Sequence, residues 1–202
     1  MIERRSALAA HELLQPAYRR VVSSPAPGRV TLSERRPLGI LQVSAFAATM
    51  DEAALRLADT LEMVLPEPNR FSGGARKSVR AVGPGIWQIV GDEVALPDAA
   101  LLRSELAGVG TVVDLGHART ALLLGGSAAV STLAKHCSLD LDRAQFPTGS
   151  ATNTRFGPVS MTLARTSDAP VFELLVARGY AEFVFEALVN AAAEYGLEIA
   201  TS

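Results

Sequence analysis

The 202-residue sequence has one cysteine, three histidines and few aromatic side chains, which make up 5% of its residues. A single cysteine cannot form an internal disulfide bond or a thiolate metal cluster, so the composition favours a reducing, cytoplasmic compartment. His11, His117 and His136 show none of the spacings typical of zinc ligands, and we predict no metal site. No apolar run approaches the roughly 20 residues of a membrane-spanning helix, and we therefore predict no membrane partner.

Net charge is also small, at −2, which provides no general basic field for nucleic acid. Its distribution is uneven, because residues 1–37 hold seven arginines against three glutamates, a balance of +4. Four prolines interrupt the same stretch, so we expect a short helix over about 5–15 and then an extended arm. This arm is either a solvated leader or a segment that orders against a partner protein. The predicted partner-binding residues are Arg4, Arg5, Arg19 and Arg20.

Beyond the arm, strand-like and helix-like patterns alternate. A strand-like run at 38–46 precedes a helix that we expect Asp51 to cap and Pro66 to end. Two short strands and a helix opened by Asp98 complete a first round.

A second round begins at 110–116. It continues with strands expected at 119–125 and 171–178, a hairpin at 150–165, and helices at 127–137 and 180–195. The predicted apolar stripe of the closing helix consists of Tyr180, Phe183, Val184, Ala187, Leu188, Ala191, Ala192 and Tyr195. Two such rounds predict an α+β fold of two split βαβ, ferredoxin-like halves with antiparallel-rich sheets. We expect a basic N-terminal arm at 1–37 and a single domain at 38–202, with halves at about 38–108 and 109–202.

The segment 112–137 combines Asp114, two histidines and Cys137, which are residue types suited to covalent catalysis. However, an apolar helical stripe accounts for the cysteine, because it consists of Val130, Leu133, Ala134 and Cys137. Cys137 also falls at the C-terminal end of the predicted helix, where the helix dipole disfavours a thiolate. We predict a core cysteine and no catalytic residue in this chain.

Two neighbours complete the prediction for this helix. Ser127 is expected to cap it after a glycine turn, so the Gly125–Gly126 pair is interpreted as a strand-to-helix turn rather than a phosphate loop. Lys135 and His136 are expected to face solvent.

Residues around Asp114 and His117 resemble the folate-binding fold of the glycine-cleavage T-protein, whose members carry an Asp-x-x-His segment at a strand end. The resemblance makes Asp114 and His117 candidate folate-binding residues. An aspartate followed closely by glycine after a strand is also a common turn-maker, which needs no ligand. Both interpretations remain open from the sequence.

A closer resemblance, over about residues 38–196, is to the gamma subunits of heterotetrameric sarcosine oxidases. The segments that carry it are LPEPN (65–69), GPGIW (83–87), DLGHARTALLLGG (114–126), LAKHCSLDLD (133–142), FPTGSATNTRFGPVSMTLAR (146–165) and FELLVARGY (172–180). It implies an aminomethyltransferase-like, folate-binding fold and a structural subunit of a complex that oxidatively demethylates sarcosine to glycine. In that family the one-carbon unit passes to tetrahydrofolate or leaves as formaldehyde.

The same resemblance implies alpha, beta and delta subunits as partners. It places FAD, FMN, NAD, tetrahydrofolate and zinc in those subunits and no cofactor in this chain. T-protein-like enzymes carry acidic residues after a Gly-Gly turn, whereas here Gly157 and Pro158 are followed by no acid before Asp168. This departure argues against folate chemistry in the chain, because such a role needs a carboxylate near the folate nitrogen.

Three alternatives stay open at this point. One is a stand-alone tetrahydrofolate-binding or aminomethyltransferase-like protein. Another is the same subunit type in a complex that acts on a different N-methyl amino acid. The third, a cysteine hydrolase, conflicts with the predicted burial of Cys137.

Overall fold

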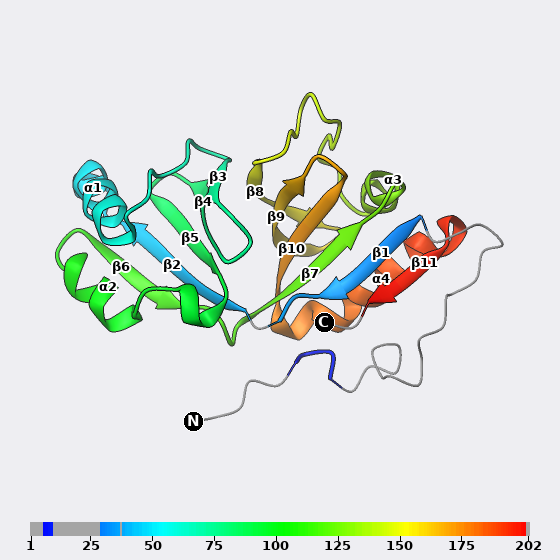
Figure 1. Ribbon diagram of the computed structural model, residues 1–202, viewed down its shortest axis with the longest axis horizontal. Helices are drawn as coiled ribbons and strands as arrows, with labels where there is room; N and C mark the ends of the chain where they lie inside the picture. Colours follow the sequence, from blue (N-terminus) through cyan, green and yellow to red (C-terminus); the bar gives the residue numbers. More distant parts are fainter. Residues whose placement is uncertain (1–5, 10–28, 37, 201–202) are drawn as a thin grey trace. The chain divides into compact units, whose positions relative to one another are not determined.

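The computed structural model describes residues 6–9, 29–36 and 38–200, and its elements are drawn in Figure 1. The chain divides into two compact units. Unit 1 comprises Met1–Arg36, His117–Thr148 and Asn153–Ser202, and unit 2 comprises Pro37–Gly116 and Gly149–Thr152. Each unit is an α+β structure with its own sheet and its own hydrophobic core, as the alternating pattern predicted.

Unit 1 is built on a six-stranded sheet with the order β11-β1-β7-β10-β9-β8. Its strands are β1 (Val30–Glu34), β7 (Arg119–Gly125), β8 (Ala151–Phe156), β9 (Val159–Ser167), β10 (Val171–Ala177) and β11 (Leu197–Ala200). β10 lies between β7 and β9 and is antiparallel to both, which makes β7 and β9 the parallel pair of a split βαβ motif. β1 pairs in parallel with β11 and antiparallel with β7.

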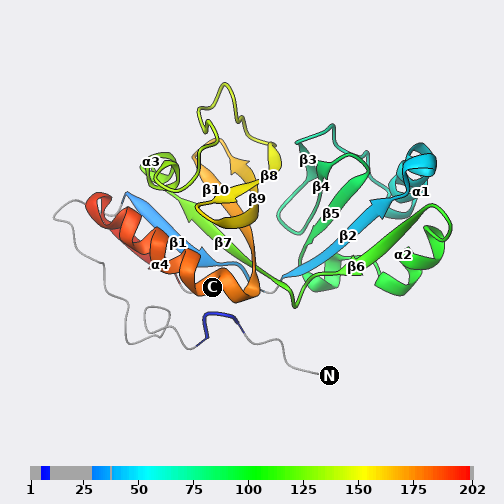
Figure 2. The ribbon, with the colours of Figure 1, turned by 180° about the vertical axis from the view of Figure 1, so that it is seen from behind.

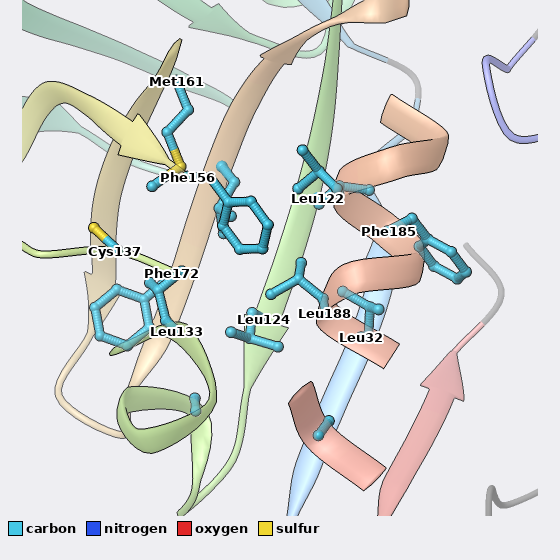
Figure 3. Close-up of a cluster of buried hydrophobic side chains, with 14 of the residues drawn as sticks. Leu32, Leu122, Leu124, Leu133, Cys137, Phe156, Met161, Phe172, Phe185 and Leu188 are labelled. Carbon is cyan, nitrogen blue, oxygen red and sulfur yellow. The ribbon is translucent and has the colours of Figure 1, made fainter. Parts of the chain in front are cut away.

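Two helices cover one side of this sheet, α3 (Ala129–Ala134) and α4 (Ala181–Ala192). Short 3-10 turns flank α4 at Arg178–Tyr180 and Ala193–Tyr195, and Figure 2 shows α4 lying across the strands. Leu188 of α4, Leu124 of β7 and Leu32 of β1 belong to the same buried cluster, which Figure 3 shows in close-up. Burial of these side chains against the sheet is the main source of the unit's stability.

Unit 2 has a five-stranded sheet with the order β3-β4-β5-β2-β6, in which every pair is antiparallel. Its strands are β2 (Gly39–Ala45), β3 (Phe71–Gly73), β4 (Lys77–Gly83), β5 (Ile86–Gly91) and β6 (Gly110–Asp114). The helices α1 (Met50–Leu61) and α2 (Ala99–Glu105) cover one side, with 3-10 turns at Ala47–Thr49 and Glu93–Ala95. The order β4-β5-β2-β6 is that of a ferredoxin-like fold, so the predicted split βαβ half is confirmed here.

The predicted end of the N-terminal arm, at residue 37, is too late in the sequence. Residues Val30–Glu34 form β1 inside the sheet of unit 1, and the side chains of Val30 and Leu32 are fully buried. The error arose because proline and arginine dominate the composition of this stretch, whereas β1 gains its stability from long-range pairing with β7 and β11.

Residues 6–9 are the other described part of the arm, and they form a turn rather than the predicted helix. Leu8 is buried in the core of unit 1, and the Ser6 hydroxyl donates a hydrogen bond to the Glu34 carboxylate at the end of β1. This part of the arm therefore packs on the chain itself. The rest of the predicted helix lies outside the described residues, as do Arg4, Arg5, Arg19 and Arg20.

The predicted boundary between the two halves is also wrong. β6 follows that boundary in the sequence, yet it pairs with β2 along the edge of the sheet in unit 2. The chain passes from one unit to the other after Gly116 rather than near residue 108. Strand pairing decides the boundary, and the local pattern does not specify which sheet a strand joins.

Asp98, which was predicted to open a helix, is its N-cap, whereas neither of the two predicted caps, Asp51 and Ser127, caps a helix. The Ala100 amide donates to the Asp98 carboxylate across 2.8 Å at the start of α2. By contrast, Asp51 lies inside the first turn of α1, and α3 begins after Ala128 with no side-chain cap from Ser127. Glu62, in a left-handed conformation, ends α1 before Pro66 is reached.

The closing helix buries only part of the predicted stripe, because Val184, Leu188, Ala191 and Ala192 are buried whereas Tyr180 and Phe183 are exposed. The buried side chains of α4 are Ala181, Val184, Phe185, Leu188, Ala191 and Ala192. Phe185 takes the core position that the sequence pattern gave to Phe183, and both Phe183 and Tyr180 are exposed. The helical repeat allows two overlapping stripes, and contact with the sheet selects one of them.

None of the helices in the described part of the chain is long and apolar enough to cross a membrane.

Candidate functional site

Cys137 lies in the hydrophobic core of unit 1, as predicted, and is a free thiol. Its Sγ atom is 4.0 Å from the Thr154 hydroxyl, and Figure 3 shows it among apolar side chains from α3 and the sheet. Ala134, which the predicted stripe also contained, is exposed. A buried thiol in this setting packs as a small apolar group.

His136 does not face solvent as predicted. It is half-buried, and its ring stacks on Phe156 with the two ring centroids 4.6 Å apart. Its carbonyl oxygen accepts a hydrogen bond of 2.7 Å from the Gly157 amide at the turn between β8 and β9. His136 therefore holds the end of α3 against the hairpin.

Lys135 is exposed, yet it joins α3 to the end of α4. Its ammonium group donates to the Ala191 carbonyl across 2.6 Å, forms a salt bridge with Glu194 and lies 4.7 Å from the centre of the Tyr195 ring. The hydrogen bond from Lys135 lowers the pKa of the Glu194 carboxyl below its usual value. A cation at this position also complements the negative end of the helix dipole.

Asp114 and His117 belong to different units. Asp114 is the last residue of β6 in unit 2, and its carboxylate accepts a hydrogen bond of 2.8 Å from the Gly116 amide. His117 is the first residue of the second segment of unit 1, and both side chains are exposed. The Asp114–Gly116 bond is the geometry expected of an Asx turn, which supports the turn-making interpretation of Asp114. Folate binding by either residue stays a prediction.

The hairpin that replaces the acidic segment of T-protein-like enzymes turns at Gly157, whose φ is +52°. The first acidic residue after this turn, Asp168, lies beyond the end of β9. Its carboxylate accepts hydrogen bonds from Arg143 at 2.9 Å and from Thr148 at 3.0 Å. Asp168 thus fastens the loop that follows α3 to the turn between β9 and β10.

Buried charged residues were missed by the sequence analysis. In unit 1, the Arg165 guanidinium donates to the carbonyl oxygens of Leu141 and Phe146 at 3.2 and 3.1 Å, and it lies over the Phe172 ring. Glu173 of β10 is buried and forms a salt bridge of 2.8 Å with Arg35. Arg165 and Glu173 could have been found from the sequence as charged residues inside apolar strands, because a charged side chain that is buried there requires a partner.

A row of polar side chains, buried at Arg80 and Gln88 and half-buried at Gln42, also crosses the sheet of unit 2. Arg80 of β4 is opposite Gln88 of β5, which in turn is opposite Gln42 of β2. The Gln88 amide donates to the Gln42 side-chain oxygen across 3.2 Å. Their alternation with core residues such as Val79 and Ile89 places this row on the side of the sheet away from the helices.

Among the described residues, no group of three or more histidine, cysteine, aspartate or glutamate side chains could hold a metal ion. Cys137, Lys135 and Asp168 all have structural partners within unit 1. These contacts assign a packing role to Cys137 and fastening roles to Lys135 and Asp168.

Comparisons with known proteins agree with this architecture. Residues 43–194 match the family described as "Sarcosine oxidase, gamma subunit family". A chain of the heterotetrameric sarcosine oxidase from Corynebacterium sp. U-96, solved in complex with pyrrole 2-carboxylate, is similar with a TM-score of 0.80 and 25% identity. That similarity covers 95% of this chain and 96% of the other.

A more distant similarity is to the glycine cleavage system aminomethyltransferase T from Bartonella henselae, with a TM-score of 0.60 and 17% identity. It covers 85% of this chain and 48% of that one, and it shows the shared fold. No curated protein sequence matches at a significant level. The family match spans more than half of the sequence, and the chain therefore belongs to the sarcosine oxidase gamma subunit family.

Proposed function

We propose that this chain is the structural, non-catalytic gamma subunit of a complex that oxidatively demethylates sarcosine to glycine. The observation that carries the proposal is the similarity to a chain of a heterotetrameric sarcosine oxidase along almost the full length of both chains. Such a match covers both units rather than one, and so supports the same role for the whole chain.

The reaction belongs to the other subunits in this proposal. Alpha, beta and delta subunits hold FAD, FMN, NAD, tetrahydrofolate and zinc, and they pass the one-carbon unit to tetrahydrofolate or release it as formaldehyde. The structural roles of Cys137, Lys135 and Asp168 support this division of labour, because each side chain already has a partner within unit 1. The complex acts in the cytoplasm.

The N-terminal arm contributes to assembly in this proposal, through Arg4, Arg5, Arg19 and Arg20. Arginine is favoured at protein interfaces because its planar guanidinium pairs with carboxylates in two-bond geometry. Within the part of the arm that the structure describes, Ser6 and Leu8 are anchored on unit 1.

The experiment is co-expression of the tagged chain with the other subunits encoded by its native host, followed by affinity purification. We expect a stoichiometric complex that contains flavin and oxidises sarcosine. Oxidation of another N-methyl amino acid in preference to sarcosine would change the substrate but keep the subunit role. Micromolar binding of tetrahydrofolate by the isolated chain, with no complex formed, would instead indicate a stand-alone folate-binding protein.

A further inference from the structure

β6 forms one edge of the sheet in unit 2, because it is the last strand in the sheet order and pairs with β2. Just past its end, the Leu115 amide donates to the Ile40 carbonyl across 2.8 Å. Bonded pairs recur at every second residue of antiparallel strands, so the odd-numbered residues of β6 direct their backbone groups to β2. The backbone groups of Gly110, Val112 and Asp114 therefore point away from β2, toward what we call the outer edge of β6.

The composition of β6 is that of a strand that pairs readily. Its sequence is GTVVD, in which three consecutive residues are β-branched. One of them, Val113, has a side chain that is 48% exposed. A strand at the edge of a sheet offers backbone donors and acceptors to another chain, and native proteins block such strands with charged side chains or a covering helix.

Two contacts from α2 and the residue after it close the outer edge. The Gly110 amide donates to the Leu106 carbonyl across 3.1 Å, and the Arg103 Nε atom donates to the Val112 carbonyl across 3.2 Å. Leu106 is buried in the core of unit 2, whereas Arg103 is exposed. The second contact therefore depends on one surface side chain, which reaches from α2 to the strand beside it (Figure 2).

No carboxylate accounts for the position of Arg103, because it forms no salt bridge with any residue that the structure describes. The other charged residues of α2 and β6 are Glu105 and Asp114. Glu105 is two positions further along α2 and so lies on another face of the helix. The Asp114 carboxylate accepts the Gly116 amide. The strand carbonyl is thus the partner that holds the Arg103 guanidinium at the outer edge.

We propose that Arg103 makes an autoinhibitory contact, which keeps the outer edge of β6 from pairing with the β6 strand of a second copy of this chain. Neighbouring strands lie about 4.8 Å apart, so a guanidinium bonded to the Val112 carbonyl occupies the place of an added strand. A second strand would have to displace this group or bury its charge, and burial of an unpaired charge is costly. The inference is independent of the proposed function, because it concerns the chain by itself.

The register of β6 makes a second copy the matching strand once Arg103 is removed. A two-fold antiparallel pair centred on Val112 places this residue opposite its twin, and places Gly110 opposite Asp114. The aspartates of the two copies therefore do not face each other. Each also lies about 7 Å along the strand from Val112, away from the carbonyl that Arg103 holds. Backbone bonding and β-branched pairs favour this arrangement, and Arg103 opposes it.

The test measures self-association of the full chain by analytical ultracentrifugation. Arg103→Ala is expected to self-associate at least about tenfold more tightly than the unaltered chain, because the Val112 carbonyl is released. Arg76→Ala is the matched control, since it removes the same charge from an exposed arginine of unit 2 outside β6, and it should behave as the unaltered chain does. Arg103→Ala combined with Val113→Lys should also return to that level, because a lysine on an edge strand opposes strand addition.

Hydrogen exchange identifies the surface that associates. The Val112 amide is expected to exchange more slowly in associated Arg103→Ala than in Arg76→Ala. Self-association of Arg103→Ala that is no tighter than that of Arg76→Ala would overturn the inference. Tighter association that Val113→Lys does not reverse would assign it to another surface and overturn the inference equally. A melting temperature of Arg103→Ala far below that of Arg76→Ala would make unfolding the cause of association, with the same consequence.

Discussion

At the scale of single residues, Cys137 shows that burial gives a potentially reactive side chain a packing role. Its thiol lies in the core of unit 1 beside Thr154. We expect Cys137→Ala to lower the free energy of unfolding by about 1 kcal/mol, and Cys137→Ser by more, because serine buries a hydroxyl group. Denaturant titration measures both values. A thiol reagent should label the native protein slowly and the denatured protein at once, and rapid native labelling at neutral pH would contradict core burial.

Glu194 gives a residue-scale prediction about pH. The Lys135 hydrogen bond lowers the folded-state pKa of Glu194 below its ordinary value of 4.5. A carboxyl with a depressed pKa adds stability above its unfolded pKa and loses it as the pH falls through the folded value. We therefore expect Glu194→Gln to reduce the melting temperature at pH 7, and this difference to shrink progressively below about pH 4.5.

The matched control for this measurement is Glu198→Gln, because Glu198 is an exposed glutamate of β11 and the salt bridge of Lys135 is with Glu194. The Glu198→Gln variant should melt at the same temperature as the unaltered chain, both at pH 7 and below about pH 4.5. If Glu194→Gln and Glu198→Gln lower the melting temperature equally at pH 7, overall charge rather than the Lys135 contact determines the effect.

At the scale of elements, the turn at residues 6–9 is the least expected part of unit 1. Leu8 is buried with the core of this unit although the turn is short and the predicted arm around it is polar and proline-rich. We expect Leu8→Ala to lower the free energy of unfolding by about 2 kcal/mol or more, as for other buried leucines. Leu55→Ala, an exposed counterpart, should change it by no more than about 0.5 kcal/mol. Equal stability of the two variants would show that the turn does not dock on the core.

At the scale of the whole molecule, similarity along the full chain to a sarcosine oxidase component leads to a prediction about the protein on its own. The sequence contains no dinucleotide fingerprint of the GxGxxG type. The purified chain should therefore be colourless and should produce no hydrogen peroxide from sarcosine, whereas the co-expressed complex should be yellow and should produce it. Visible absorbance of flavin and a peroxide assay are the measurements. A yellow preparation of the isolated chain would contradict a non-catalytic role.

The sequence by itself determined the features that depend on local pattern. The alternation of strand-like and helical segments specified two split βαβ motifs, because side-chain periodicity differs between the two kinds of element. It also specified the strand at Arg119–Gly125, the start of α2 at Asp98 and the burial of Cys137. Each of these follows from residues that are close together in the chain.

Only the tertiary structure decided the features that depend on distant partners. β1 is a strand because β7 and β11 pair with it, and β6 belongs to unit 2 because it pairs with β2. Phe185 rather than Phe183 is buried because the face of α4 that carries Phe185 packs against the sheet. Long-range pairing and the choice between overlapping apolar stripes are settled by contacts between segments, which no local window of sequence contains.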